Sequence, residues 1–192
     1  VDLTSSFNAY GELPRGIQGG FGLVIRPDGG EEEVTIPVDA PASNVQTTRV
    51  TGTLSTDGKF EGHYIETAVG SIAAGMRASF ASPLDSTQRS DAAPQIARKY
   101  FPNADGDSLL AFNGKDYAAP VRVSVRITNA NATTTAGAVE MLNNPFSSFA
   151  RMTTAADDIS RLPSRHFPID ASRIVGRLTG ISEFRVTLPV GW

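Results

Sequence analysis

Two strand-like runs joined by an Asp-Gly turn constrain the fold of this chain more than any other feature of its sequence. The runs occupy residues 46–67 and flank the segment Ser55-Thr56-Asp57-Gly58-Lys59. Glycine supplies the positive φ angles of a tight turn at little steric cost, and Asp-Gly is a favoured pair in such turns. The segment therefore predicts a β-hairpin.

A second strong signal is an alternation of apolar and polar residues with a period of two. The apolar residues of this run are Val121, Val123, Val125 and Ile127, and polar residues stand between them. This period is typical of a strand with one buried and one solvent-facing side. Weaker patterns predict strands at residues 17–26 and 34–36, around a turn at 27–30, and at 136–142, 164–169 and 183–188, the last with Phe184, Val186 and Leu188 facing inward. Residues 143–158 are predicted to form a surface loop.

The hydrophobic period changes to three and four residues in the middle of the chain, which predicts helices. The apolar face of the first helix consists of Val69, Ile72, Ala73, Met76 and Phe80. The second helix is expected to begin near Ser90 or Asp91, with Pro94 in its first turn, where a missing N–H is tolerated. Its inward-facing residues are Ile96, Ala97 and Tyr100. Together the patterns predict an α+β fold of mainly antiparallel β-structure, sandwich-like or a curved sheet, with two helices in the middle of the chain.

The composition excludes several classes of site. The chain has no cysteine, which excludes thiol catalysis, disulfides, zinc–cysteine sites and iron–sulfur clusters. The net charge is −3 with both signs interspersed, so there is no sustained basic surface and we expect no nucleic-acid partner. No apolar run approaches the roughly 20 residues that a membrane helix requires, so we expect no membrane insertion.

The length of 192 residues predicts one β-rich domain that extends over residues 1–192. The first residues lie inside a motif, and the last strand stops at Pro189-Val190-Gly191-Trp192. We therefore expect the domain to be excised from a larger chain. Removal of neighbouring structure would expose apolar surface or an unpaired strand edge, which favours self-association.

Three stretches of the sequence carry a family resemblance. They are Val1-Asp2-Leu3-Thr4 with Gly11-Glu12-Leu13-Pro14 and Ile17-Gln18-Gly19-Gly20; Val50-Thr51-Gly52-Thr53-Leu54 with residues 57–62 and 70–77; and residues 165–169 with residues 184–189. Together they resemble bacterial transglutaminase-like proteins, in which a papain-fold domain is followed by a β-rich C-terminal region. The resemblance extends over nearly the whole chain and implies that residues 1–15 are the tail end of an upstream transglutaminase-like domain.

The catalytic residues of that family are a Cys-His-Asp set, in which a thiolate attacks an amide or ester carbonyl. By motif position, Asp2 matches the carboxylate of this set, and the resemblance implies that the cysteine and histidine precede Val1. His63 and His166 occupy other positions, in predicted strands. A carboxylate without nucleophile or base performs no acyl transfer, so we expect no catalytic residue to act in this chain and no enzymatic activity.

Two other kinds of site have partial or no support in the sequence. Asn103, Asp105 and Asp107 place three oxygen-bearing side chains at alternate positions around Gly106, as in a calcium loop, but Gly114 stands where an EF-hand loop has its closing glutamate. The alternative is a polar turn between helix and strand. A serine hydrolase lacks support because the sequence contains no Gly-x-Ser-x-Gly elbow.

The sequence thus predicts a non-catalytic accessory region of an exported bacterial transglutaminase-like protein, located in the periplasm or outside the cell. Its expected partner is its own upstream catalytic domain, which it packs on or restrains, or another protein or surface polymer. The alternative is a free-standing binding module of the cell envelope for glycan or calcium. No cofactor is expected apart from that calcium ion.

Overall fold

The computed structural model describes residues 5–82, 84–146 and 178–192. Its strands are β1 (Phe21–Ile25), β2 (Glu31–Thr35), β3 (Val45–Leu54), β4 (Lys59–Ala68), β5 (Asp105–Phe112), β6 (Val121–Asn131), β7 (Thr133–Ala136), β8 (Val139–Leu142) and β9 (Thr179–Thr187). Its helices are the 3-10 helix η1 (Pro41–Ser43), α1 (Ser71–Ser79) and α2 (Ser86–Tyr100). The predicted α+β fold, mainly antiparallel with two helices in the middle of the chain, is confirmed.

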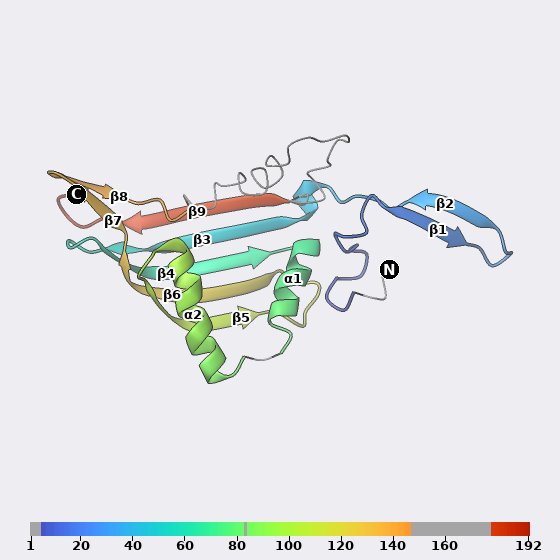
Figure 1. The fold of residues 1–192 in the computed structure, drawn as a ribbon, viewed down its shortest axis with the longest axis horizontal. Helices are drawn as coiled ribbons and strands as arrows, with labels where there is room; N and C mark the ends of the chain where they lie inside the picture. The colour runs from blue at the N-terminus through green and yellow to red at the C-terminus, as the bar shows by residue number, and fades with distance from the viewer. Residues whose placement is uncertain (1–4, 83, 147–177) are drawn as a thin grey trace, which may run out of the picture.

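Five strands form the main sheet, in the order β5-β6-β4-β3-β9 (Figure 1). The predicted hairpin is confirmed as β3 and β4, which pair antiparallel on either side of Gly58, whose φ is 76°. The pairs β4–β6 and β5–β6 are also antiparallel. In contrast, β9 pairs parallel to β3 at the edge of the sheet. The last strand of the chain therefore lies beside the first strand of the main sheet.

Both helices lie on one face of this sheet (Figure 1), and α2 packs chiefly against β5 and β6. The core between helices and sheet contains a cluster of aromatic rings. The Phe60 ring centroid lies 5.0 Å from that of Phe101 and 5.8 Å from that of Phe184. Phe60 is fully buried. Among the described residues, the arrangement is thus one sheet covered by helices, not two packed sheets.

A pair of glycines makes room for Phe60. Gly52 and Gly62 face each other across β3 and β4, next to a register shift between Phe60 and Gly62. A Cβ on either glycine would lie 2.7 Å from the Phe60 ring and 2.1 Å from a backbone oxygen of the partner strand. Real Cβ atoms do not approach so closely, so only glycine fits both positions.

The second helix begins earlier than predicted. Asp85 caps α2 by accepting a hydrogen bond from the backbone N–H of Gln88, and the Gln88 side chain accepts one from the backbone N–H of Asp85. This capping box satisfies two N–H groups that a helix start leaves without partners. Pro94 consequently lies inside the helix rather than in its first turn, so the predicted start at Ser90 or Asp91 is wrong.

Several strands differ from the predictions in their number or position. β5 begins at Asp105, in a segment predicted as a polar turn, because its backbone pairs with β6 and packs closely against α2. The predicted strand at 136–142 is instead a hairpin of β7 and β8, with Gly137 at a φ of 64° between them. The strand predicted at 17–26 is present but begins at Phe21.

The C-terminal predictions have mixed outcomes. β9 extends over the predicted strand up to Thr187, and Phe184 and Val186 pack against the core as expected. Leu188 does not, because it lies beyond the paired part of the strand and is 46% exposed. The strand predicted at 164–169 and most of the loop predicted at 143–158 lie outside the described residues.

Strands β1 and β2 form a two-stranded ribbon that projects from the main body of the protein (Figure 1). Phe21, Leu23 and Ile25 alternate along one side of the ribbon, opposite Thr35, Glu33 and Glu31. The three apolar side chains are exposed. The ribbon therefore presents an apolar row on β1 beside a row on β2 that contains Glu31 and Glu33.

Candidate functional site

The helix-facing side of the main sheet changes from apolar to polar along its strands. Val50, Tyr64 and Phe184 belong to the apolar part. Side chains in a strand alternate between the two faces, so residues two positions apart share a face. Toward one end of the sheet the same face therefore carries Gln46, Thr48, Glu66 and Ser182. Polar side chains at inward positions depart from the usual pattern of a core, and such departures mark candidate functional sites.

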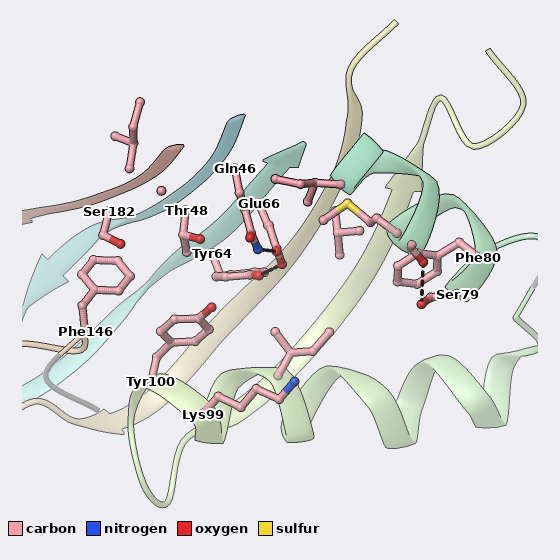
Figure 2. Close-up of a pocket in the computed structure, with 17 residues that line it drawn as sticks. Gln46, Thr48, Tyr64, Glu66, Ser79, Phe80, Lys99, Tyr100, Phe146 and Ser182 are labelled. Atoms are coloured by element: carbon pink, nitrogen blue, oxygen red, sulfur yellow. Dashed lines mark hydrogen bonds between the residues drawn. The ribbon is translucent and has the colours of Figure 1, made fainter. Parts of the chain in front are cut away.

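A pocket of about 660 Å³ lies over this polar area (Figure 2). Helices α1 and α2 form its other walls, through apolar side chains and the stem of Lys99. The lining residues include Ile72, Gly75, Met76, Phe80, Ile96, Tyr100, Val123, Phe146 and Ile181 in addition to the polar residues of the sheet. Its volume lies within the range of small-molecule sites in proteins.

The position of α1 over the sheet is fixed by a buried asparagine. Asn44 Oδ1 accepts hydrogen bonds from the backbone N–H and the hydroxyl of Ser71, both at 2.8 Å. Gly70, just before the helix, has a φ of 71° and packs so close to the Ser43 carbonyl that a Cβ would lie 2.2 Å from it. The start of α1 is therefore held against the start of β3, and this contact sets one wall of the pocket.

Glu66 is the acidic residue of the pocket floor. Its Oε2 accepts a hydrogen bond from the Tyr64 hydroxyl, and its Oε1 accepts one from the Gln46 amide (Figure 2). Both donors are neutral. Each carboxylate oxygen has a second lone pair, so Glu66 has capacity to accept hydrogen bonds from a bound molecule.

The rings of Tyr64 and Tyr100 pack against each other beside Glu66, tilted by 35° and with centroids 4.8 Å apart. Burial raises the pKa of the Tyr64 phenol far above its ordinary value, and the charge of Glu66 raises it further. Burial also raises the pKa of Tyr100, although its hydrogen bonds with Tyr64 and Thr48 act in the opposite direction. Both hydroxyls therefore keep their protons at neutral pH, and Tyr64 stays a donor to Glu66.

A second feature of the structure holds the N-terminal segment, residues 5–20, near its beginning. Arg77 is buried on α1, where its Nη1 donates to the Phe7 carbonyl and its Nη2 donates to the Tyr117 and Ala119 carbonyls, each at 3.2 Å. The Tyr117 hydroxyl donates to the Ser6 carbonyl at 2.7 Å, and the Arg77 guanidinium lies 5.1 Å from the Tyr117 ring centroid. We call this set of contacts the N-terminal anchor.

The residues singled out from the sequence are not brought together. Asp2 and His166 lie outside the described residues. His63 is exposed on β4, on the face away from the pocket, opposite Arg126. Hence the described part of the chain places no histidine in the pocket.

The three residues predicted to bind calcium are divided between a turn and the strand that follows it. Asn103 has a φ of 72° just before β5. Asp105 and Asp107 belong to β5, where Asp105 accepts a hydrogen bond from Asn129 at 3.3 Å and Asp107 lies opposite Arg126 in the strand register. The described residues contain no group of three or more histidine, aspartate or glutamate side chains that could hold a metal ion. Calcium binding stays an untested prediction.

The sequence did not predict the pocket, although it contains a signal for part of the pocket floor. Once Val50 and Tyr64 are taken as inward-facing, the period of two places Thr48 and Glu66 on the same side. The contributions of α1, α2 and Ser182 depend on tertiary packing and have no such signal.

No protein-family model matches the chain, and comparisons with curated proteins and with solved structures found no significant similarity. None of the described helices combines the length and the apolar character needed to cross a membrane.

Proposed function

We propose that this chain is a non-catalytic accessory region of an exported bacterial transglutaminase-like protein, and that it packs on the catalytic domain of that protein. The observation that carries the proposal is the N-terminal anchor. By motif position, Asp2 matches the catalytic carboxylate of the transglutaminase-like family, and the anchored residues Ser6 and Phe7 follow it closely in the chain. A catalytic carboxylate must be held in a defined geometry to orient its histidine, and an anchor just after it would restrict its movement.

The anchor is suited to such a role because it binds backbone rather than side chains. Three carbonyl oxygens surround one buried guanidinium, which supplies its hydrogen bonds in a fixed planar geometry. Since no carboxylate of the described residues pairs with Arg77, its charge is balanced by carbonyl dipoles, two of them from the 113–120 loop. The N-terminal segment thus completes the environment of a buried charge.

The β1–β2 ribbon supports the same proposal. Phe21 and Ile25 are 68% and 71% exposed, and they follow the N-terminal segment directly in the chain. Exposed apolar rows rimmed by charges are typical of protein contact sites. A domain preceding this segment would lie within reach of both the anchor and the ribbon.

The test begins with the coding sequence upstream of Val1. The proposal requires a cysteine followed by a histidine there, in the order of the family's catalytic set. The longer protein should then transfer acyl groups between an amide and an amine, and the 192-residue chain alone should not. Arg77→Met in the longer protein should lower kcat, while Arg89→Met, a matched change on the exposed side of α2, should not. An upstream sequence without the cysteine and histidine would contradict the proposal.

A second candidate function is a free-standing binding module of the cell envelope for glycan or calcium. The pocket favours this candidate, because its floor carries several hydrogen-bonding groups and two tyrosine rings beside an apolar wall. A signal peptide directly before Val1 would support this function over the first.

A further inference from the structure

The floor of the pocket is rich in hydrogen-bond acceptors. Glu66 accepts one hydrogen bond at each oxygen and can accept more. The Gln46 amide donates to Glu66, which leaves its carbonyl oxygen as an acceptor. Thr48 and Ser182 add hydroxyl oxygens on the neighbouring strands. A ligand that is rich in donors fits this surface better than one that is rich in acceptors.

The negative charge of Glu66 favours a ligand with a positive charge. Within the described part of the chain, no lysine, arginine or histidine nitrogen lies within 4.0 Å of a Glu66 carboxylate oxygen, the distance that defines an ion pair. Its two partners, Tyr64 and Gln46, are neutral. A carboxylate in a partly desolvated site gains from a cation that comes close to it.

Lys99 is not the cation that balances the charge of Glu66. It extends from α2, on the side of the pocket formed by the helices, whereas Glu66 extends from β4 (Figure 2). Lys99 is exposed, and a long exposed ammonium keeps its hydration when its stem lines a pocket. The positive end of a ligand is therefore directed toward the sheet and away from α2.

The remaining walls accept an apolar group. Ile72 and Met76 of α1, Phe80 just after α1 and Ile96 of α2 line the pocket, and each is only partly buried by the protein itself. The thioether of methionine adapts to ligands of different shape and contacts aromatic rings favourably. An apolar group here would remove more of these side chains from water.

We infer that this pocket binds a small amphipathic amine, with its ammonium group at Glu66 and its apolar part against Met76 and Phe80. The amine is defined by its chemistry: a protonated primary amine joined to an aromatic or branched aliphatic group. Binding of this kind does not depend on the proposed accessory role, because every residue involved belongs to the described domain.

The experiment compares phenethylamine with phenethyl alcohol, a neutral molecule of nearly the same shape, by NMR titration of the whole chain. We expect the amine to bind at least about tenfold more tightly, since hydrogen bonds to charged groups stabilise more than neutral ones. Glu66→Gln should weaken amine binding by a similar factor and leave alcohol binding unchanged. Glu61→Gln is the matched control, because it removes the same charge from the exposed part of β4 outside the pocket.

A second pair of variants tests the apolar part. Gly75 lines the pocket, and a Cβ there would meet no atom within 4 Å. Gly75→Leu should therefore fill the pocket without straining α1 and should abolish binding of both probes. Ala78→Leu, on the exposed part of the same helix and outside the pocket, should not. This pair keeps the inference testable if Glu66→Gln fails to fold.

Three results would overturn the inference. They are equal affinity for the amine and the alcohol, equal effects of Glu66→Gln and Glu61→Gln, or no binding of phenethylamine to the wild-type chain at millimolar concentration. Success or failure here leaves the upstream-sequence test of the accessory role untouched.

Discussion

Replacing Arg77 by methionine should release the N-terminal segment, and the size of the effect follows from the contacts of the N-terminal anchor. Arg77 donates to the carbonyls of Phe7, Tyr117 and Ala119. A hydrogen bond from a charged donor contributes about 1.5–3 kcal/mol, and part of the loss is offset because methionine buries no charge. We expect the free energy of unfolding to fall by about 2–4 kcal/mol in total.

The N-terminal segment alone loses only one of these bonds, the one to Phe7. Its local opening should therefore become easier by about 1.5–3 kcal/mol, which makes the opened form about 10- to 150-fold more populated. Chymotrypsin cleaves after phenylalanine, and the peptide bond after Phe7 contains the carbonyl that Arg77 binds. When opening is fast relative to cleavage, the cleavage rate follows the opened population.

The assay is limited chymotrypsin digestion with the cleavage sites identified by mass spectrometry. Cleavage after Phe7 should accelerate about 10- to 150-fold in Arg77→Met. Cleavage after Tyr10, which is 92% exposed, serves as the internal comparison. Tyr117→Phe removes a neutral hydrogen bond and should accelerate cleavage only about 2- to 10-fold.

Arg98→Met provides the matched control, because Arg98 also donates to a backbone carbonyl, that of Ala104 at 3.2 Å, but on α2. The reasoning would be refuted if Arg77→Met were cleaved after Phe7 no faster than Arg98→Met.

Three further predictions concern stability, each measured by denaturant unfolding. Gly75→Ala should stabilise the protein by about 1 kcal/mol, because alanine is the better helix former and the added Cβ meets no atom within 4 Å; a loss of stability would contradict this. Gly52→Ala should destabilise it by about 2–4 kcal/mol, because the Cβ would lie 2.1 Å from the Glu61 carbonyl oxygen and 2.7 Å from the Phe60 ring, and a neutral result would show that the strands can move apart. The raised pKa of Tyr64 favours the protonated phenol in the folded state. The contribution of Tyr64 to the free energy of unfolding is therefore complete below about pH 10. Above that pH it falls by up to about 1.4 kcal/mol per pH unit. Tyr64→Phe should make the free energy of unfolding fall less steeply above about pH 10. An unchanged slope would show that other groups cause the fall.

The elements that the sequence predicted correctly are those with a local cause. The Asp57-Gly58 turn and the alternation at 121–127 act within a few residues, so the β3–β4 hairpin and β6 follow from them directly. The first helix was predicted from its apolar spacing, which its packing over the sheet satisfies. The predicted start of α2 is wrong because the helix begins at the capping box of Asp85 and Gln88, not near Ser90 or Asp91.

β5 shows where local patterns fail. Its first residues, from Asp105 to Ser108, have low β-propensity and resemble a turn. Pairing with β6 and packing against α2 override this preference, since Gly106 lies so close to the Ala93 carbonyl that a Cβ would lie 2.3 Å from it. A contact between these two segments cannot be read from either one alone.

The candidate site also has a part that local sequence predicts and a part that depends on packing between distant segments. The sequence by itself determined the hairpin, and with it that Thr48 and Glu66 lie opposite each other on one face, because side-chain direction in a strand follows from a period of two. Only the tertiary structure decided that this polar area lies under α1 and α2 and beside Ser182, and that Arg77 holds residues far away in the chain. Those contacts arise from packing between distant segments, and local propensity contains no information about them.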